Sequence, residues 1–158
     1  MEALARKIGQ RLKAAKGVLV TAESCTGGWA AQVVTSVAGS SEWFDRGFVT
    51  YSDAAKQELL GVRAETLRQH GAVSEETARE MALGALGRSH GTLALSITGV
   101  AGPTGGSKEK PVGTVCFGWA SGNHVRSETR LFSGDRESVR KQSVIRALQG
   151  VLQALDGA

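Results

Sequence analysis

The chain has 158 residues, of which 41% are hydrophobic and 22% charged, with a formal net charge of +4 at pH 7. This length and composition are typical of one globular domain and exclude a disordered or fibrous chain. The aromatic content of 5% argues against a protein that binds single-stranded nucleic acid by base stacking, and the positive charge favours anionic ligands only weakly.

Apolar periodicity and turn residues divide the chain into alternating helices and strands. In chain order, the pattern predicts a helix over 2–15, a strand over 17–22, a helix over 26–38, a strand over 48–51, short helices over 53–61 and 64–70, a helix over 74–88, a strand over 92–98, paired strands over 111–120 and 124–132, and a last helix from 135. Asp53 and Ser74 are the expected N-caps of two of these helices.

Two of the predicted strands, GVLVTA (17–22) and TLALSIT (92–98), are continuously apolar, which is typical of parallel strands buried on both faces. The last two strands alternate instead and are joined by a Ser-Gly-Asn turn, which predicts an antiparallel hairpin near one edge of the sheet. We therefore expect a single domain over 1–158 of the α/β class. It would have three layers, α/β/α, around a mixed, mostly parallel sheet.

The sequence contains no motif for a metal site or for secretion. Cys25 and Cys116 lie far apart, without a CxxC motif or a cysteine–histidine pair, so no structural zinc site is predicted. The amphipathic N-terminal segment is not a signal peptide, and no apolar stretch reaches the roughly 18 residues of a membrane span. We expect a cytoplasmic protein with reduced thiols and no membrane partner.

The first candidate site is the segment AESCTGG (22–28), where a buried strand ends and a helix begins. Ligands of open α/β sheets bind beyond the carboxyl ends of the strands, and a helix start offers free N–H groups. Ser24 could be a nucleophile there, and Gly27 and Gly28 would let a ligand approach the backbone. Two alternatives stay open: Ser24 or Thr26 merely caps the helix, or Cys25 is the nucleophile.

The second candidate is the loop 99–111, which holds four glycines and both prolines of the chain. It follows a buried strand and should open at the same sheet edge as Ser24. A glycine-rich backbone can turn its N–H groups toward an anion, although the loop could also be purely structural. Its candidate binding residues are Gly99, Gly102 and Gly105.

The third candidate is the start of the last helix, where Arg136 and Arg140 share one face. Cations in the first turns oppose the helix dipole, and a bound phosphate would offset that cost. The alternative is a solvated basic face that pairs with Asp135 and Glu137.

The fourth candidate combines Tyr51, which ends a predicted strand, with Lys56 in the helix that follows. A partly buried lysine can lose its proton and act as the base for a serine. The alternative is a surface lysine and a tyrosine at the edge of the core. The three histidines, His70, His90 and His124, are expected to be solvated.

Six motifs occur in order along the chain: AESCTGG, FVTYSDAAK with Leu59 and Val62 after it, GAVSEETA, ITGVAGPTGG, KPVGTV and FSGDRESVR. Together they resemble the carboxy-terminal domain of competence-damage-inducible (CinA) proteins, over residues 5–155. In its stand-alone form this domain is a nicotinamide-nucleotide amidase. Six motifs in register make the resemblance highly specific, and no counterpart of the amino-terminal CinA domain is expected.

The resemblance implies that the protein hydrolyses the carboxamide of nicotinamide mononucleotide to nicotinate mononucleotide and ammonia. In the family's motifs the nucleophile corresponds to Ser24, and the family's tyrosine and lysine correspond to Tyr51 and Lys56. Backbone N–H groups near Cys25 to Gly28, with Thr98, would hold the oxyanion. The substrate phosphate would lie against the glycine loop, Arg136 or Arg140, and no cofactor is expected.

The resemblance leaves other points open. Asp53 stands where the family usually has Asn, and its charge could tune Lys56 or weaken the binding of an anionic substrate. Trp43 and Phe44 are expected to be exposed and could form a homo-oligomer contact. The alternative functions are a non-catalytic nucleotide-binding module, an amidase for another small pyridine amide and an accessory protein of DNA uptake.

Overall fold

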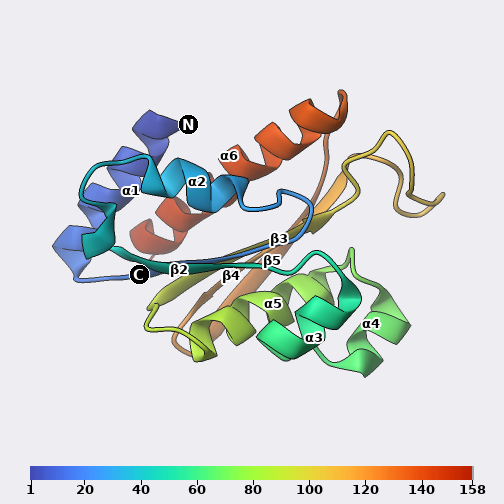
Figure 1. The fold of residues 1–158 in the computed structure, drawn as a ribbon, viewed down its shortest axis with the longest axis horizontal. Coiled ribbons are helices and arrows are strands. Elements are labelled where there is room, and N and C mark those ends of the chain that lie inside the picture. The colour runs from blue at the N-terminus through green and yellow to red at the C-terminus, as the bar shows by residue number, and fades with distance from the viewer. Residues whose placement is uncertain (158) are drawn as a thin grey trace.

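The computed structural model describes residues 1–157 and contains one five-stranded sheet with the order β2-β1-β3-β4-β5 (Figure 1). The strands are β1 (Leu19–Glu23), β2 (Phe44–Val49), β3 (Leu93–Gly99), β4 (Thr114–Ser121) and β5 (His124–Leu131). β1 pairs in parallel with β2 and β3, whereas β4 pairs antiparallel with β3 and β5. Four of the five strands therefore run in the same direction, which confirms the predicted mixed sheet with its hairpin at one edge.

Helices cover both faces of this sheet, which confirms the three-layer architecture (Figure 1). One layer contains α1 (Glu2–Ala15), α2 (Trp29–Thr35) and α6 (Arg136–Asp156), and the other contains α3 (Asp53–Leu60), α4 (Ala64–His70) and α5 (Glu75–Gly87). A separate apolar cluster fills the space on each side of the sheet. β1, β3 and β4 are buried along almost their whole length because both of their faces pack against helices.

Side-chain caps define where three of the helices begin. Ser52, Ser74 and Asp135 accept hydrogen bonds from the N–H groups of Ala55, Thr77 and Ser138, at 3.0, 3.1 and 2.9 Å. Each bond satisfies one of the N–H groups that a first helical turn leaves free. Ser74 is the predicted cap, whereas the prediction for Asp53 is wrong by one position: Asp53 is the first residue of α3, and Ser52 caps it.

Two predicted boundaries are wrong. The helix predicted over 26–38 is only α2, because Gly27 and Gly28 have φ angles of 59° and 103° and keep the segment after Ser24 in turns. The strand predicted over 48–51 begins at Phe44 and ends at Val49, so Tyr51 follows β2 instead of ending it.

The predicted exposure of Trp43 is also wrong. Its side chain is 2% exposed and packs against α1 where Gly9 lacks a side chain; a Cβ on Gly9 would lie 2.5 Å from the indole ring. Phe44 is half-buried against the same cluster. Trp43 therefore cannot take part in the homo-oligomer contact predicted from these two rings.

The topology brings distant segments to one end of the sheet. Because β1, β2 and β3 are parallel, the residues after Glu23, Val49 and Gly99 all emerge at their carboxyl ends. β5 ends at the same edge and leads through Gly134 into α6. All four candidate sites of the sequence therefore converge on this edge.

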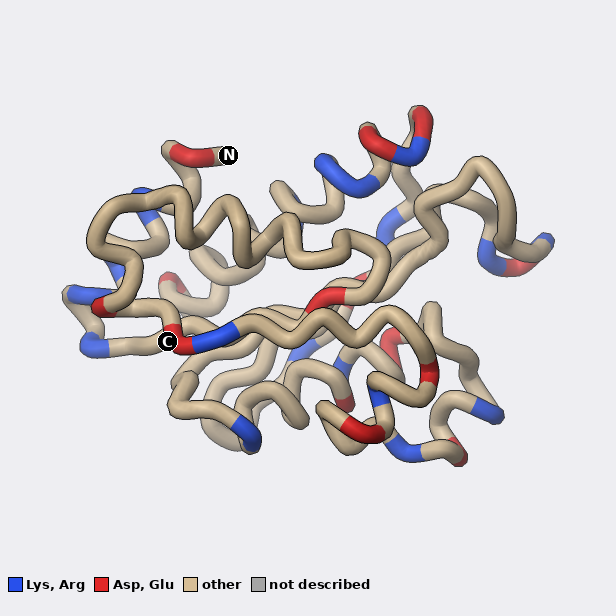
Figure 2. Tube along the Cα trace, viewed as in Figure 1, with Lys and Arg blue, Asp and Glu red and all other residues tan. Residues whose placement is uncertain are grey.

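The charged residues are spread over the molecule. Figure 2 shows Lys and Arg interspersed with Asp and Glu along the helices on both sides of the sheet. None of the helices in residues 1–157 combines the length and apolarity needed to span a membrane.

Candidate active site

Ser24 and Lys56 meet at the carboxyl ends of the parallel strands, although 32 residues separate them in the sequence. The Nζ of Lys56 donates to Ser24 Oγ at 2.9 Å, to the carbonyl oxygen of Thr50 at 2.9 Å and to that of Tyr51 at 3.1 Å. Each of the three ammonium protons thus has one acceptor. The two backbone acceptors direct the amine at the serine hydroxyl.

Lys56 is only 1% exposed, and no carboxylate within residues 1–157 forms an ion pair with it. Burial lowers the pKa of Lys56 because the ammonium loses its hydration, and the negative charge of Asp53 opposes this shift. Asp53, in the first turn of α3, therefore raises the pKa of Lys56 against the effect of burial. A lysine in this setting can exist in its neutral form and accept a proton from Ser24.

Cys25, the rival nucleophile, is 6% exposed. Burial raises its pKa to about 12, so the thiol keeps its proton at neutral pH. Since the thiolate is the nucleophilic form of cysteine, the structure favours Ser24 over its neighbour.

A cavity of about 230 Å³ surrounds the Ser24–Lys56 pair. The predicted site residues that line it are Ser24, Tyr51, Lys56, Thr98, Gly99 and Arg136. The predicted residues outside its lining are Thr26, Gly27, Gly28, Gly102, Gly105 and Arg140. Ala72 and Val73, which also line it, were not predicted as site residues. They belong to GAVSEETA, and Thr98 is held against them because its hydroxyl donates to the Ala72 carbonyl at 2.9 Å.

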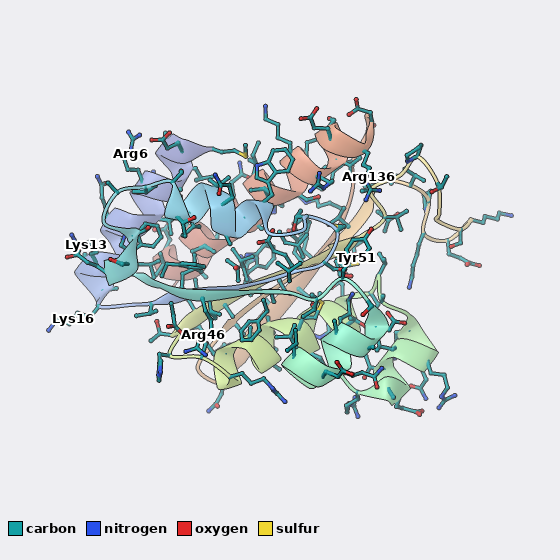
Figure 3. The ribbon with its side chains drawn as sticks, viewed as in Figure 1. Arg6, Lys13, Lys16, Arg46, Tyr51 and Arg136 are labelled. Carbon is teal, nitrogen blue, oxygen red and sulfur yellow. The ribbon has the colours of Figure 1, made fainter. Side chains whose placement is uncertain are left out.

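Tyr51 and Arg136 flank the cavity at the end of the sheet (Figure 3). Arg136 donates to the carbonyl oxygen of Gly102 at 2.7 Å and to the phenol oxygen of Tyr51 at 3.4 Å. Tyr51 as a whole is 64% exposed, while its backbone carbonyl contacts Lys56 inside the cavity. Arg136 therefore reaches from α6 to the glycine loop and to the segment after β2.

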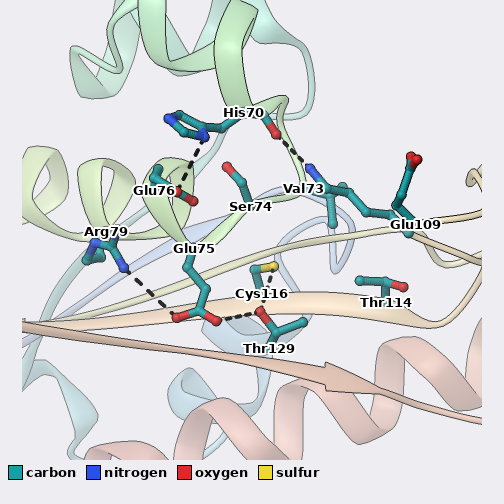
Figure 4. Close-up of a pocket in the computed structure, with 11 residues that line it drawn as sticks. His70, Val73, Ser74, Glu75, Glu76, Arg79, Glu109, Thr114, Cys116 and Thr129 are labelled. Carbon is teal, nitrogen blue, oxygen red and sulfur yellow. Dashed lines mark hydrogen bonds and ion pairs between the residues drawn. The ribbon is translucent and has the colours of Figure 1, made fainter.

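A larger hollow of about 470 Å³ lies between α5, β4 and β5 (Figure 4). Several of its charged groups are already paired: Glu75 accepts from Ser127 and Thr129, and His70 lies 3.3 Å from Glu76. No serine or cysteine in its lining contacts a lysine or histidine. All three histidines are exposed, as predicted, and none lines the Ser24 cavity. The smaller cavity is therefore the candidate active site.

Two charged side chains hold the turn that carries Ser24. Arg140 donates through Nε to the Cys25 carbonyl at 3.0 Å and through Nη2 to the Thr26 carbonyl at 3.2 Å. Glu23, buried beneath the turn, accepts from the Thr26 hydroxyl at 2.7 Å. Glu23 is not among the predicted site residues, although a carboxylate next to a helix start is a recognisable signal.

Glu23→Gln is expected to lower the free energy of unfolding by about 2 kcal/mol, because charge-assisted hydrogen bonds are lost in the core. The carboxylate also accepts from the N–H groups of Ala30 and Ala31 at 2.8 and 3.1 Å, and the Gln amide would place a donor against one of them. Urea unfolding measures the change. The exposed Glu2→Gln serves as the matched control, and equal stability of the two variants would contradict the assigned role.

Comparison with known proteins identifies the family of the chain. The family model of the CinA C-terminal domain matches residues 1–155. The nicotinamide-nucleotide amidohydrolase PncC of Escherichia coli K12 is 56% identical over 151 residues, covering 95% of this chain and 92% of that protein. The protein of the same name from Pseudomonas putida is 51% identical over 150 residues, covering 95% and 94%. A crystal structure of a CinA superfamily protein from Klebsiella pneumoniae matches with a TM-score of 0.96 at 39% identity, covering 99% and 98% of the two chains. The chain belongs to the CinA C-terminal domain family.

Proposed function

We propose that this protein hydrolyses the carboxamide of nicotinamide mononucleotide to nicotinate mononucleotide and ammonia, with Ser24 as nucleophile and Lys56 as base. The observation that carries the proposal is the 2.9 Å contact between Lys56 Nζ and Ser24 Oγ inside a closed environment that lowers the pKa of the lysine. The substrate is inferred from the relatives named nicotinamide-nucleotide amidohydrolase.

In the first step, neutral Lys56 takes the proton of Ser24 while Oγ attacks the amide carbon. The C–O bond forms as the electron pair of the carbonyl moves onto its oxygen. Backbone N–H groups of the turn after Ser24 bind that oxyanion, and the Thr98 hydroxyl lines the same cavity. Collapse of the intermediate breaks the C–N bond, and Lys56 returns the proton to the leaving ammonia.

In the second step, water attacks the acyl-enzyme and gives up its proton to Lys56, which restores Ser24 as the carboxylate leaves. Tyr51 contributes its backbone carbonyl, which keeps the amine of Lys56 directed at Ser24. Its phenol lies beside Arg136 and faces the ring or ribose of the substrate.

The nucleotide needs more space than the 230 Å³ cavity provides, since pockets for such ligands usually measure roughly 300–1,000 Å³. A neighbouring hollow of about 480 Å³ shares Ala101 and Arg136 with the cavity and extends over Gly134. We place the pyridine amide in the smaller cavity and the ribose phosphate in this second hollow. Arg136 lines both hollows, and we therefore choose it as the phosphate ligand. Arg140 is the weaker candidate because its guanidinium already binds two carbonyls.

Arg136→Met is expected to raise KM for nicotinamide mononucleotide about 30-fold, which corresponds to the loss of about 2 kcal/mol from one charge-assisted contact. Hydrolysis of nicotinamide riboside, which lacks the phosphate, should change little. Steady-state assays with both substrates separate the two effects. Lys141→Met removes the same charge from an exposed position of α6 and provides the control. Equal losses with both substrates would argue against a phosphate contact.

The direct test of the proposed function is ammonia release by the purified protein. The substrate panel comprises nicotinamide mononucleotide, nicotinamide, nicotinamide riboside and NAD. Preferred turnover of the mononucleotide supports the proposal, whereas turnover of another amide would identify a related amidase. Tight binding of the mononucleotide without ammonia release would instead indicate a nucleotide-binding module.

A further inference from the structure

Arg140 lies behind the turn that carries the nucleophile. Ser24 and Cys25 line the cavity, whereas Arg140 does not, so its contacts to the carbonyls of Cys25 and Thr26 lie on the face of the turn that points away from the cavity. The guanidinium also lies 5.4 Å from the centre of the Trp29 ring. A planar group with two bonded carbonyls and a stacked aromatic neighbour has little freedom to move.

This arrangement determines the direction of one N–H group. In a planar trans peptide, the carbonyl of one residue and the N–H of the next point in opposite directions. Since Arg140 binds the Cys25 carbonyl, the N–H of Thr26 points away from Arg140, toward the face of the turn on which Ser24 and Cys25 line the cavity, although Thr26 is not itself part of that lining. The next peptide is arranged differently, because the N–H of Gly27 donates to the Ser24 carbonyl at 3.1 Å.

The N–H of Thr26 has no hydrogen-bond acceptor among residues 1–157, although Thr26 is fully buried. Buried backbone donors without a partner are rare, and each one calls for an explanation. The first N–H groups of α2 cannot take its place, because those of Ala30 and Ala31 already bind the carboxylate of Glu23. A free donor two residues after the nucleophile is the kind of group that an oxyanion requires.

We propose that Arg140 is a positioning residue that holds the Cys25–Thr26 peptide in the orientation in which its N–H binds the oxyanion formed on the substrate amide. This inference rests on the proposed amidase function. Arg140 itself touches neither the substrate nor the reacting atoms. Without it, the Cys25 carbonyl loses its donor, and the peptide can rotate so that the N–H leaves the oxyanion site.

The test compares Arg140→Met and Arg140→Lys with Lys141→Met, which removes an exposed charge from the neighbouring position. Loss of one oxyanion donor typically lowers kcat on the order of 100-fold, so we expect that loss in Arg140→Met with KM nearly unchanged. Arg140→Lys can still donate to one carbonyl and should recover part of the activity. Lys141→Met should behave as the wild type.

A transition-state mimic supplies a second readout. In the analogue of nicotinamide mononucleotide with an aldehyde in place of the carboxamide, Ser24 Oγ adds to the carbonyl carbon, the π electron pair moves to oxygen, and Lys56 takes the serine proton. Its affinity should fall by the same factor as kcat in Arg140→Met. In the Ser24→Ala background, where no adduct forms, the same Arg140 substitution should leave the affinity for the mononucleotide unchanged.

Three results would overturn the proposal. A raised KM with unchanged kcat would make Arg140 a substrate ligand, and unchanged kcat and KM would make it a bystander. Equal activity losses in Arg140→Met and a folded Arg140→Lys, without any loss of aldehyde affinity, would indicate a structural role alone. If the wild type releases no ammonia, the proposed amidase function fails first, before any variant of Arg140 is compared.

Discussion

Ser24→Ala is expected to eliminate ammonia release from nicotinamide mononucleotide, with a loss in kcat on the order of 10⁵-fold. The substitution removes the attacking oxygen, and the neighbouring thiol of Cys25 cannot replace it because its pKa is raised to about 12. The backbone of the site should persist, since the N–H of Ser24 still donates to the Ile97 carbonyl at 2.9 Å. Ammonia release and thermal unfolding, measured on the same preparation, test both statements.

Cys25→Ala is the matched control for this experiment, since it changes the adjacent side chain in the same turn. It removes one buried sulfur, so a small loss of stability is expected, while the activity should stay near that of the wild type. Rapid quenching followed by mass spectrometry should find the acyl group on the peptide that contains residue 24, on serine and not on cysteine. An active Ser24→Ala variant combined with an inactive Cys25→Ala variant would assign the reaction to the thiol.

Much of the fold follows from local patterns in the sequence. The continuous apolar runs around β1 and β3 predict buried parallel strands, and residues 78, 81, 82 and 85 are fully buried on one face of α5, as their helical spacing indicates. The predictions are wrong where residues distant in the sequence determine the burial of a side chain. Trp43 is buried because Gly9, far away in the sequence, leaves room for its ring, and no local pattern contains that information.

In the candidate site, too, some features follow from the sequence and others depend on tertiary packing. Parallel strands place Ser24, Lys56 and the glycine loop at one sheet edge, so their proximity could be predicted from topology. The different positions of Arg136 and Arg140 could not, because both occupy the same face of one helix in the sequence pattern. Only the packing of α6 against the sheet directs Arg140 behind the turn and Arg136 into the cavity.

Lys56→Met is expected to lower kcat about 10³-fold, within the range usual for the removal of a general base. Methionine fills a similar volume without the amine, so Ser24 keeps its position but loses its proton acceptor. The exposed Lys7→Met, on α1, is the control for the loss of one positive charge. Near-normal turnover in Lys56→Met would refute the Ser24–Lys56 pair.

The pH dependence of the wild type should report the same group. Burial lowers the pKa of Lys56 below the usual lysine value of 10.5, so kcat/KM should rise with pH through the lowered pKa and reach its plateau before 10.5. Between these two pKa values the unfolded chain binds one more proton than the folded protein, and the free energy of unfolding therefore rises with pH. The stabilisation is fully present above 10.5 and is lost as the pH falls through the lowered pKa.

Lys56→Met should remove this pH-dependent contribution to stability together with the activity. Below the lowered pKa the wild type carries a buried ammonium, and removal of this charge stabilises the variant. The carbonyls of Thr50 and Tyr51, which lose their donor, destabilise it. Urea unfolding of both proteins across the pH range measures the difference. If that difference does not vary with pH, Lys56 titrates alike in the folded and unfolded chains, and it cannot supply the neutral amine that the mechanism requires.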